Sequence, residues 1–527
     1  MVIRAVCLLY LSVLVCMTVS AQPPEGSGRT LLVIPFENSS PTPGLEWLGE
    51  GFAETLRSQL DSPLLYVATR EERLRAYDRQ AIPAGIHPSR ATLYRLAEQM
   101  DVDYTVLGSY RFDGDSLTVN AQLLDMHAPK LLPEVSESGQ LPNLGNLQSA
   151  LAWDLLHQIR PDFVLPKDKY VAGLPPQRLD ALDAYVHGVL ASDTDEKIRY
   201  FREAARISPT FAEAWLELGK AYFANESYES ASAALQKVPA SAAVAREANF
   251  YLGLSSCARG DLDTAQKAFE FVVARLPLAE VYNNLGVVAA RRGQKRAAAD
   301  FERAVENDPS DPDYHFNLGL TLGRAGDRAR AAREMRIVLE HRPGDAEART
   351  LLESFNSAAS GAPNNPTRFP AERLKREYQE NVFRQMKMQI QSWAEQQFAR
   401  SDPRSHARYH VELGRELLGH GFVSEAESEF RHASAVDPTS PFPHAALAEA
   451  YVAGGDPAQA RNEAEASLRI RESAEAYVVL TRLDLGENHA AEAEKEINRA
   501  LQLEPRNSTA LDLKRAVTAT LNGKEQP

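Results

Sequence analysis

The residues of this chain that could hold a metal are few. His406 and His410 are four residues apart, so a helix would place both imidazoles on one face at metal-ligand spacing. The glutamate that a metallopeptidase carries directly after its first histidine is absent, and no third ligand is in view. Asp113 and Asp115 flank Gly114, but the rest of a calcium loop is missing and a hairpin turn explains them better. We therefore predict no metal site and no cofactor, and we expect solvated histidines.

Catalytic motifs are also missing from the sequence. It contains no glycine-rich loop of the kind that binds phosphates and no nucleophile elbow. Cys257 would be the one cysteine left after removal of a signal peptide, so no disulfide framework is possible, and its helical position favours packing over reactivity. We predict no catalytic residues and expect that the protein is not an enzyme.

Two asparagines and two arginines offer a more coherent chemistry. Asn284 and Asn317 each precede a Leu-Gly pair, and Arg291 and Arg324 follow them at equal distance. An amide side chain both donates and accepts, so a row of amides can hold an extended peptide by its backbone, while arginines can bind acidic side chains. We predict a peptide-binding groove that contains Asn284, Asn317, Arg291, Arg324, Phe250 and Phe316. The alternative is that Asn-Leu-Gly is routine repeat sequence and that the arginines form a solvated face.

The elements that would position these residues recur along most of the chain. The stretch Trp215–Tyr222 opens a pattern of a Leu-Gly pair, a later alanine and apolar residue, and then a proline. Units begin near residues 212, 246, 279, 312, 407, 441 and 474, at spacings of 33 or 34. Within each unit the apolar residues fall at helical spacing, so each unit is two amphipathic helices that must stack on their neighbours to bury their apolar faces.

Mid-helix glycines recur at one place in these units and indicate close helix approach. A glycine there costs roughly 1 kcal/mol relative to alanine, so its repetition needs a shared reason. We expect the glycines of the first helices to face alanines of the second helices. The glycines are 219, 253, 286, 319 and 414, and the alanines are 231, 265, 331, 426, 460 and 493.

This period and pattern resemble the tetratricopeptide repeat. The resemblance implies helix pairs whose first members line an inner groove. It also supports peptide binding, because some proteins of this family use asparagines at the position of Asn284 and Asn317. A degenerate opening repeat is expected over Ala181–Pro209.

The composition limits the partners that the protein can have. Its 58 basic and 72 acidic residues give a net charge of −14, which argues against nucleic acid as the main partner. The partner that the repeats predict is a protein or peptide, and the sequence does not specify the oligomeric state.

The N-terminus has the features of a secretory signal. Arg4 precedes the apolar run Ala5–Val19, and small residues lead up to Ala21. We predict a signal peptide over residues 1–21 and a periplasmic or secreted protein. The alternative is an uncleaved segment that anchors the protein in the inner membrane, and only then would it contact a membrane.

Residues 30–165 predict a small α/β domain with a mixed sheet. Asp113-Gly114 joins two strands as a hairpin, and the second strand alternates apolar and polar residues. The expected elements are strand 31–37, helix 45–60, strand 64–67, helix 90–99, hairpin strands 104–112 and 116–124, and helix 147–159.

Three stretches of this domain resemble the amino-terminal domain of TolB, which related bacterial envelope proteins carry ahead of repeats. They are V-I-P-F-E-N-S-S at 33–40, G-E-G-F-A-E-x-L at 49–56 and D-Y-T-V-L-G-S-Y at 103–110. The resemblance implies an envelope-side binding module, and it supplies no catalytic residues.

The sequence thus predicts an α-solenoid in two arrays behind a small α/β domain. We expect a first array over 178–356, a linker over 357–370, one long polar helix over 371–400 and a second array over 401–521. The expected function is a non-enzymatic protein-interaction scaffold of the bacterial cell envelope. The alternative is an assembly factor or regulatory adaptor anchored in the inner membrane.

Overall fold

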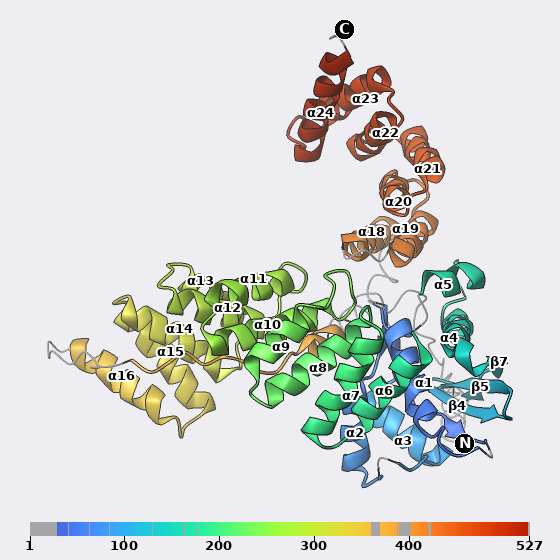
Figure 1. Cartoon of the computed structure of the whole chain (residues 1–527). Coiled ribbons are helices and arrows are strands. Elements are labelled where there is room, and N and C mark those ends of the chain that lie inside the picture. The colour runs from blue at the N-terminus through green and yellow to red at the C-terminus, as the bar shows by residue number, and fades with distance from the viewer. Residues whose placement is uncertain are drawn as a thin grey trace, which may run out of the picture.

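The structure, a computed structural model, consists of an α/β domain followed by two helical arrays (Figure 1). It describes residues 29–359 apart from 41, 63, 84, 129, 162, 164 and 175–176, then 369–386, 388, 402–419 and 423–524. The predicted signal peptide over 1–21 and most of the predicted linker over 357–370 lie outside these residues. Within the described part of the chain, no helix combines the length and apolar character needed to cross a membrane.

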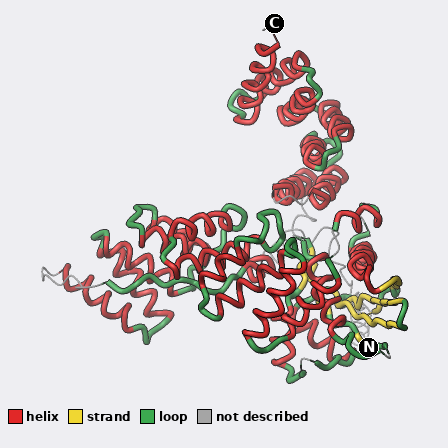
Figure 2. The backbone as a smooth tube through the Cα atoms, in the orientation of Figure 1, coloured by secondary structure: helices red, strands yellow, loops and turns green. Residues whose placement is uncertain are grey.

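The α/β domain contains the expected mixed sheet. Strands β3, β1 and β4 are parallel neighbours, β4 pairs antiparallel with β5, and β5 pairs with both β6 and β7. The strands gather at one end of the molecule (Figure 2). Helix α2 and the strands β6 and β7 were not expected from the sequence. The elements are β1 (Arg29–Val33), β2 (Glu37–Asn38), α1 (Trp47–Leu60), β3 (Leu65–Val67), α2 (Arg70–Arg79), α3 (Arg90–Met100), β4 (Tyr104–Phe112), β5 (Ser116–Asp125), β6 (Lys130–Leu131), β7 (Val135–Gln140), α4 (Leu144–Ile159) and α5 (Lys167–Gly173).

The first array stacks helix pairs from α6 onward, as the repeat pattern predicts. Its helices are α6 (Leu179–Leu190), α7 (Thr194–Ile207), α8 (Ala212–Ala224), α9 (Tyr228–Leu235), α10 (Ala245–Arg259), α11 (Leu262–Val273), α12 (Ala279–Arg291), α13 (Ala297–Asn307), α14 (Pro312–Arg324), α15 (Arg328–His341) and α16 (Ala346–Ala359). The opening pair shares a hydrophobic core with the α/β domain, because Phe52 of α1 belongs to the same buried cluster as Val186 of α6 and Phe201 of α7. The first array is therefore built directly onto the α/β domain.

The second array repeats the same construction. Its helices are α18 (Pro403–Gly419), α19 (Val423–Val436), α20 (Phe442–Ala453), α21 (Pro457–Ile470), α22 (Ala474–Gly486), α23 (Ala490–Leu503) and α24 (Ser508–Lys524). Leu64 of the α/β domain packs into the core of α18 and α19, so the second array begins against that domain.

The recurring glycines mark close helix contacts, but their partners differ from the expected alanines. A Cβ atom on Gly253 would lie 2.5 Å from the ring of Phe269, and one on Gly286 would lie 2.6 Å from the ring of Phe301. The nearest group is thus a large side chain one helical turn after the alanine position. The glycine provides room for that side chain, whereas Ala265 is fully buried beside it.

The prediction of one long helix over 371–400 is wrong at its start. Residues 371–379 have no helical structure, and helix begins at Glu380 and continues through residue 386. Leu374, Tyr378, Val382 and Met386 do fall at helical spacing. The first array nevertheless accepts hydrogen bonds from the backbone N–H groups of Arg373, Lys375 and Gln379, which takes the place of a helical bonding pattern there. Residues 389–401 lie outside the described part of the chain.

Candidate functional site: an occupied peptide groove

The groove of the first array contains an extended segment of the same chain. We call residues 369–380 the strap. It starts near the α16 end of the array and runs back along the first helices of successive repeats towards the α/β domain, as the thin orange-tan line that crosses the array in Figure 1. Its direction is opposite to the order of the repeats, because Arg373 contacts Asn317 and Lys375 contacts Asn284.

The predicted asparagine row holds the strap by its backbone. Asn317 donates from Nδ2 to the Arg373 carbonyl at 2.8 Å and accepts from the Arg373 N–H at 2.8 Å. Asn284 makes the same pair of hydrogen bonds with Lys375, each at 2.9 Å. Asn283 donates to the Arg373 carbonyl at 2.9 Å and accepts from Asn317 at 2.8 Å. A step of one repeat along the groove therefore corresponds to two residues of the extended strap. These hydrogen bonds do not depend on the strap's side chains.

Arg291 and Arg324 bind an acidic side chain of the strap. Both guanidinium groups lie beside the Glu372 carboxylate, with Arg291 Nε at 3.8 Å and Arg324 in direct hydrogen-bonding contact. The Glu372 side chain is only 6% exposed, so the two arginines supply its counter-charge in a largely dry setting. Arg324 also donates to the carbonyl of Pro370 at 2.9 Å.

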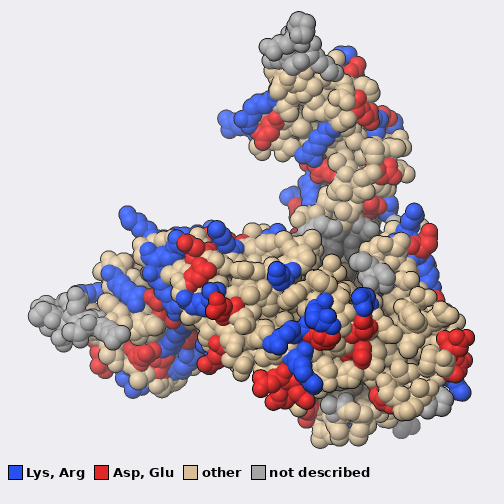
Figure 3. Space-filling view, in the orientation of Figure 1, with Lys and Arg blue, Asp and Glu red and all other residues tan. Residues whose placement is uncertain are grey.

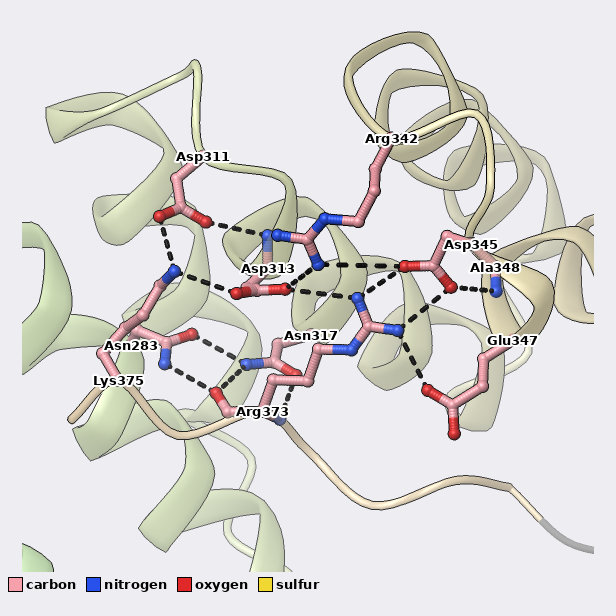
Figure 4. A network of polar contacts seen from close by, with 10 residues as sticks. All are labelled: Asn283, Asp311, Asp313, Asn317, Arg342, Asp345, Glu347, Ala348, Arg373 and Lys375. Carbon is pink, nitrogen blue, oxygen red and sulfur yellow. Dashed lines mark hydrogen bonds and ion pairs between the residues drawn. The ribbon is translucent and has the colours of Figure 1, made fainter.

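Basic side chains of the strap enter an acidic cluster on the facing helices (Figure 4). Arg373 Nη1 lies 2.7 Å from Asp345 Oδ2 and 3.2 Å from Asp313 Oδ1. Lys375 Nζ lies 2.9 Å from Asp313 Oδ2 and 2.6 Å from Asp311 Oδ2. The strap thus places opposite charges into matching positions along the groove.

The pKa values of the acidic cluster reflect these ion pairs. Burial acts to raise the pKa of Asp313, but hydrogen bonds from Arg342 and Lys375 outweigh it and lower the pKa to about 2. The hydrogen bond from Arg373 holds the pKa of Asp345 below its usual value. Both carboxylates are therefore charged at neutral pH, which favours retention of the strap.

Aromatic rings complete the contact at the two predicted phenylalanines. Phe316 is fully buried, and the Arg373 guanidinium lies over its ring at 3.5 Å from the centroid. Phe250 is also fully buried, with its ring centroid 5.1 Å from that of Tyr378. Leu374 packs against buried clusters on both sides of this part of the groove.

The end of the strap leads into contacts with the α/β domain. Glu280 accepts from the Gln379 N–H at 2.9 Å, and Arg246 Nη2 lies 2.6 Å from Glu380 Oε1. In the helical turn that follows, Arg384 Nη1 lies 2.6 Å from Asp61 Oδ2. Met388 is buried in the cluster that covers β1 and α3. The strap is therefore fixed to the array, and the residues that follow it are fixed to the α/β domain.

Comparisons with known proteins identify the repeat type. Residues 189–249 and 252–312 each match a family model described as tetratricopeptide repeat. These helix pairs are tetratricopeptide repeats. Among curated proteins, none matches the chain.

Solved structures are similar to parts of the chain at low identity. YrrB, described as a TPR protein with an unusual peptide-binding site, is 19% identical over 33% of this chain and 92% of its own, with a TM-score of 0.31. MamA is 24% identical over 29% of this chain and 92% of its own, with a TM-score of 0.28. The first TPR of Spaghetti (RPAP3), bound to an HSP90 peptide, is 24% identical over 22% of this chain and 93% of its own, with a TM-score of 0.21.

The structure places all six predicted groove residues of the tetratricopeptide array against the strap, a segment of the same chain. Arg291 and Arg324 both lie beside Glu372, and their side chains are 32% and 34% exposed, so binding of a separate peptide by these residues stays a prediction. Sequence reasoning missed Arg246, Glu280 and the acidic cluster around Asp313. The available signal was the charge pattern of residues 372–380, in which acidic and basic residues complement those on the groove.

The expectation of solvated histidines is wrong for one of the pair. His410 is fully buried, and its Nδ1 lies 2.8 Å from Glu429 Oε2. Its Nε2 lies 3.0 Å from Nε2 of His406. The packing of α18 against α19 creates this environment, which a reading of α18 alone does not reveal.

Proposed function

We propose that this protein is a non-enzymatic protein-interaction scaffold of the bacterial cell envelope whose first tetratricopeptide array binds an extended peptide of a partner. The observation that carries the proposal is the hydrogen bonding of Asn284 and Asn317 to the strap backbone. Because these bonds address main-chain groups, another extended segment can make them equally well. The strap then acts as a resting occupant that the partner replaces.

The charges along the groove define the chemistry of that partner. Arg291 and Arg324 require an acidic residue, and the cluster around Asp313 requires basic residues one and three positions later. On the face drawn in Figure 3, positive and negative side chains are interspersed over the first array. A mixed-charge peptide, rather than a uniformly acidic one, fits this pattern.

The strap competes with any partner from within the same molecule. A segment tethered within the same molecule competes at an effective concentration on the order of millimolar. For a strap with an intrinsic Kd of about 1 μM, a free peptide would therefore bind roughly a thousandfold more weakly than it would to the empty groove. Binding in the intact protein requires either a tight partner or a signal that loosens the strap.

A labelled peptide with the sequence of residues 369–380 tests the proposal. We expect it to bind a full-length variant with Arg373→Glu and Lys375→Glu, which repel the acidic cluster, and to bind the unaltered protein far more weakly. Adding Asn284→Ala and Asn317→Ala to the variant should abolish binding. If hydrogen exchange shows that the strap has left the groove and the peptide still does not bind, the proposed function is wrong.

The envelope location is supported by the sequence of the α/β domain and the N-terminus. Two of the three stretches that resemble the TolB amino-terminal domain run through β1, β2 and β4, which are neighbours in the sheet. Cell fractionation with mass measurement of the mature N-terminus tests this location. A mass that begins after Ala21 supports a periplasmic or secreted scaffold, and a full-length mass in the membrane fraction supports the anchored assembly factor.

A further inference from the structure

Three histidines meet between the first two helices of the second array. His406 and His410 lie on α18, and His432 of α19 joins them. One potential ligand atom from each residue can be chosen so that all three lie within 4.8 Å of one another. The ring centroids of His410 and His432 are 4.2 Å apart, and those of His406 and His410 are 4.8 Å apart. The third ligand that the sequence lacked beside His406 and His410 therefore comes from the neighbouring helix.

The geometry points to a binding site for a first-row divalent cation of the zinc type, held by His406, His410 and His432. Nitrogen ligands of tetrahedral zinc lie about 2.0–2.1 Å from the ion, and so roughly 3.4 Å from each other. The Nε2 atoms of His406 and His410 are 3.0 Å apart, which a small side-chain movement would adjust. Three imidazoles are the ligand set that zinc and its neighbours in the first row accept.

A carboxylate orients the central imidazole in the way that metal-binding histidines require. His410 Nδ1 lies 2.8 Å from Oε2 of Glu429, whose side chain is 2% exposed. When Nδ1–H donates to this carboxylate, Nε2 carries a lone pair that faces His406.

The chain contains two internal comparisons for this arrangement. His315 and His444 each lie 19 residues before a glutamate, as His410 does, and each pairs through Nδ1 with that glutamate at 2.7 Å. Their Nε2 atoms contact a different kind of group, the Pro309 carbonyl for His315 and the Ser434 hydroxyl for His444. The His–Glu pair is therefore a recurring structural feature of these repeats, whereas the gathering of further imidazoles distinguishes the pair at His410.

A second cluster of possible metal ligands lies further along the second array. Asp484, Glu487 and His489 also lie close enough to one another to share an ion. Arg461 already lies among them, at 2.7 Å from Asp484 and 3.0 Å from Glu487. A cation there would compete with an arginine, so we assign one site to the described residues and place it at the three histidines.

Cobalt binding to the untagged, chelator-treated full-length protein tests the site. We expect one equivalent of Co²⁺ to give the visible absorption of a tetrahedral nitrogen-bound ion, and Zn²⁺ to displace it. His406→Gln and His432→Gln should each lower the affinity at least tenfold, and Glu429→Gln should lower it about 10- to 100-fold through loss of ligand orientation. His444→Gln, which removes a histidine with the same glutamate pairing, should leave binding unchanged.

Two results would overturn the proposed metal site. If the unaltered protein takes up no Co²⁺, or if His432→Gln binds it as tightly as the unaltered protein, the three histidines form only a packed cluster. Circular dichroism and thermal unfolding of each variant show whether it folds. His406→Gln is the second measurement should His432→Gln fail to fold, because His406 is only half-buried.

Discussion

Replacing Asn317 by alanine is the most direct test of how the strap is held. The substitution removes three hydrogen bonds of the Asn317 side chain: one to the Arg373 carbonyl, one from the Arg373 N–H and one to Asn283. The Arg373 carbonyl keeps its bond from Asn283, so the N–H is the backbone group left without its partner. A buried donor left unsatisfied costs about 1–3 kcal/mol, and a lost hydrogen bond contributes about 1 kcal/mol more.

These terms predict a measurable opening of the strap. Their sum is about 2 to 4 kcal/mol, which corresponds to a roughly 30- to 700-fold change in the equilibrium between docked and released strap. Hydrogen exchange followed by mass spectrometry measures this change as faster exchange of the strap amides, provided that local opening precedes exchange. Exchange in the β4–β5 hairpin should not change, because that hairpin lies in the α/β domain.

An asparagine of the repeat before Asn283 provides a control. Asn249 lies on α10. Its Nδ2 donates to the Ala245 carbonyl of its own helix and not to the strap. Asn249→Ala should therefore leave strap exchange unchanged. The reasoning fails if Asn317→Ala leaves the strap as protected as before, or if Asn249→Ala opens it to the same degree.

Three further predictions concern other contacts of the first array. The double variant Arg291→Glu, Arg324→Glu should repel Glu372, so hydrogen exchange at the start of the strap should become faster. Binding of a peptide that carries an acidic residue at the position of Glu372 should fall at least tenfold. Unchanged exchange and unchanged peptide binding would contradict the assigned ion pairs. Because the pKa of Asp313 is lowered, its charged carboxylate stabilises the docked strap fully above about pH 4, and this stabilisation is lost as the pH falls towards about 2. Hydrogen exchange of the strap amides, corrected for intrinsic rates, should therefore rise only between about pH 4 and pH 2. A rise already near pH 6 would point to another group. Gly286→Ala should lower the stability of the first array by about 1–3 kcal/mol through overpacking, measured by thermal unfolding, whereas Gly293→Asn at an open left-handed turn should have a smaller effect.

The residues that line the groove could be predicted from the sequence, whereas the segment that fills it could not. Asn284 and Asn317 were identified from their place in the repeat, because a repeating unit puts equivalent residues on the same face. The occupant was not identified, because residues 374, 378, 382 and 386 have the apolar spacing of a helix. Amide groups of the array hydrogen-bond the backbone of residues 373 and 375, and this tertiary environment overrides the local helical pattern.

The sequence by itself determined the helix pairs, their period and the positions where two helices come close. These properties depend on residues near one another in the chain, and the same residue pattern recurs in each repeat. Only the tertiary structure decided which side chain enters the space beside Gly253, which segment fills the groove, and which third imidazole joins His406 and His410. Each of these contacts joins residues from different helices or from distant parts of the chain, and their meeting depends on how the helices stack.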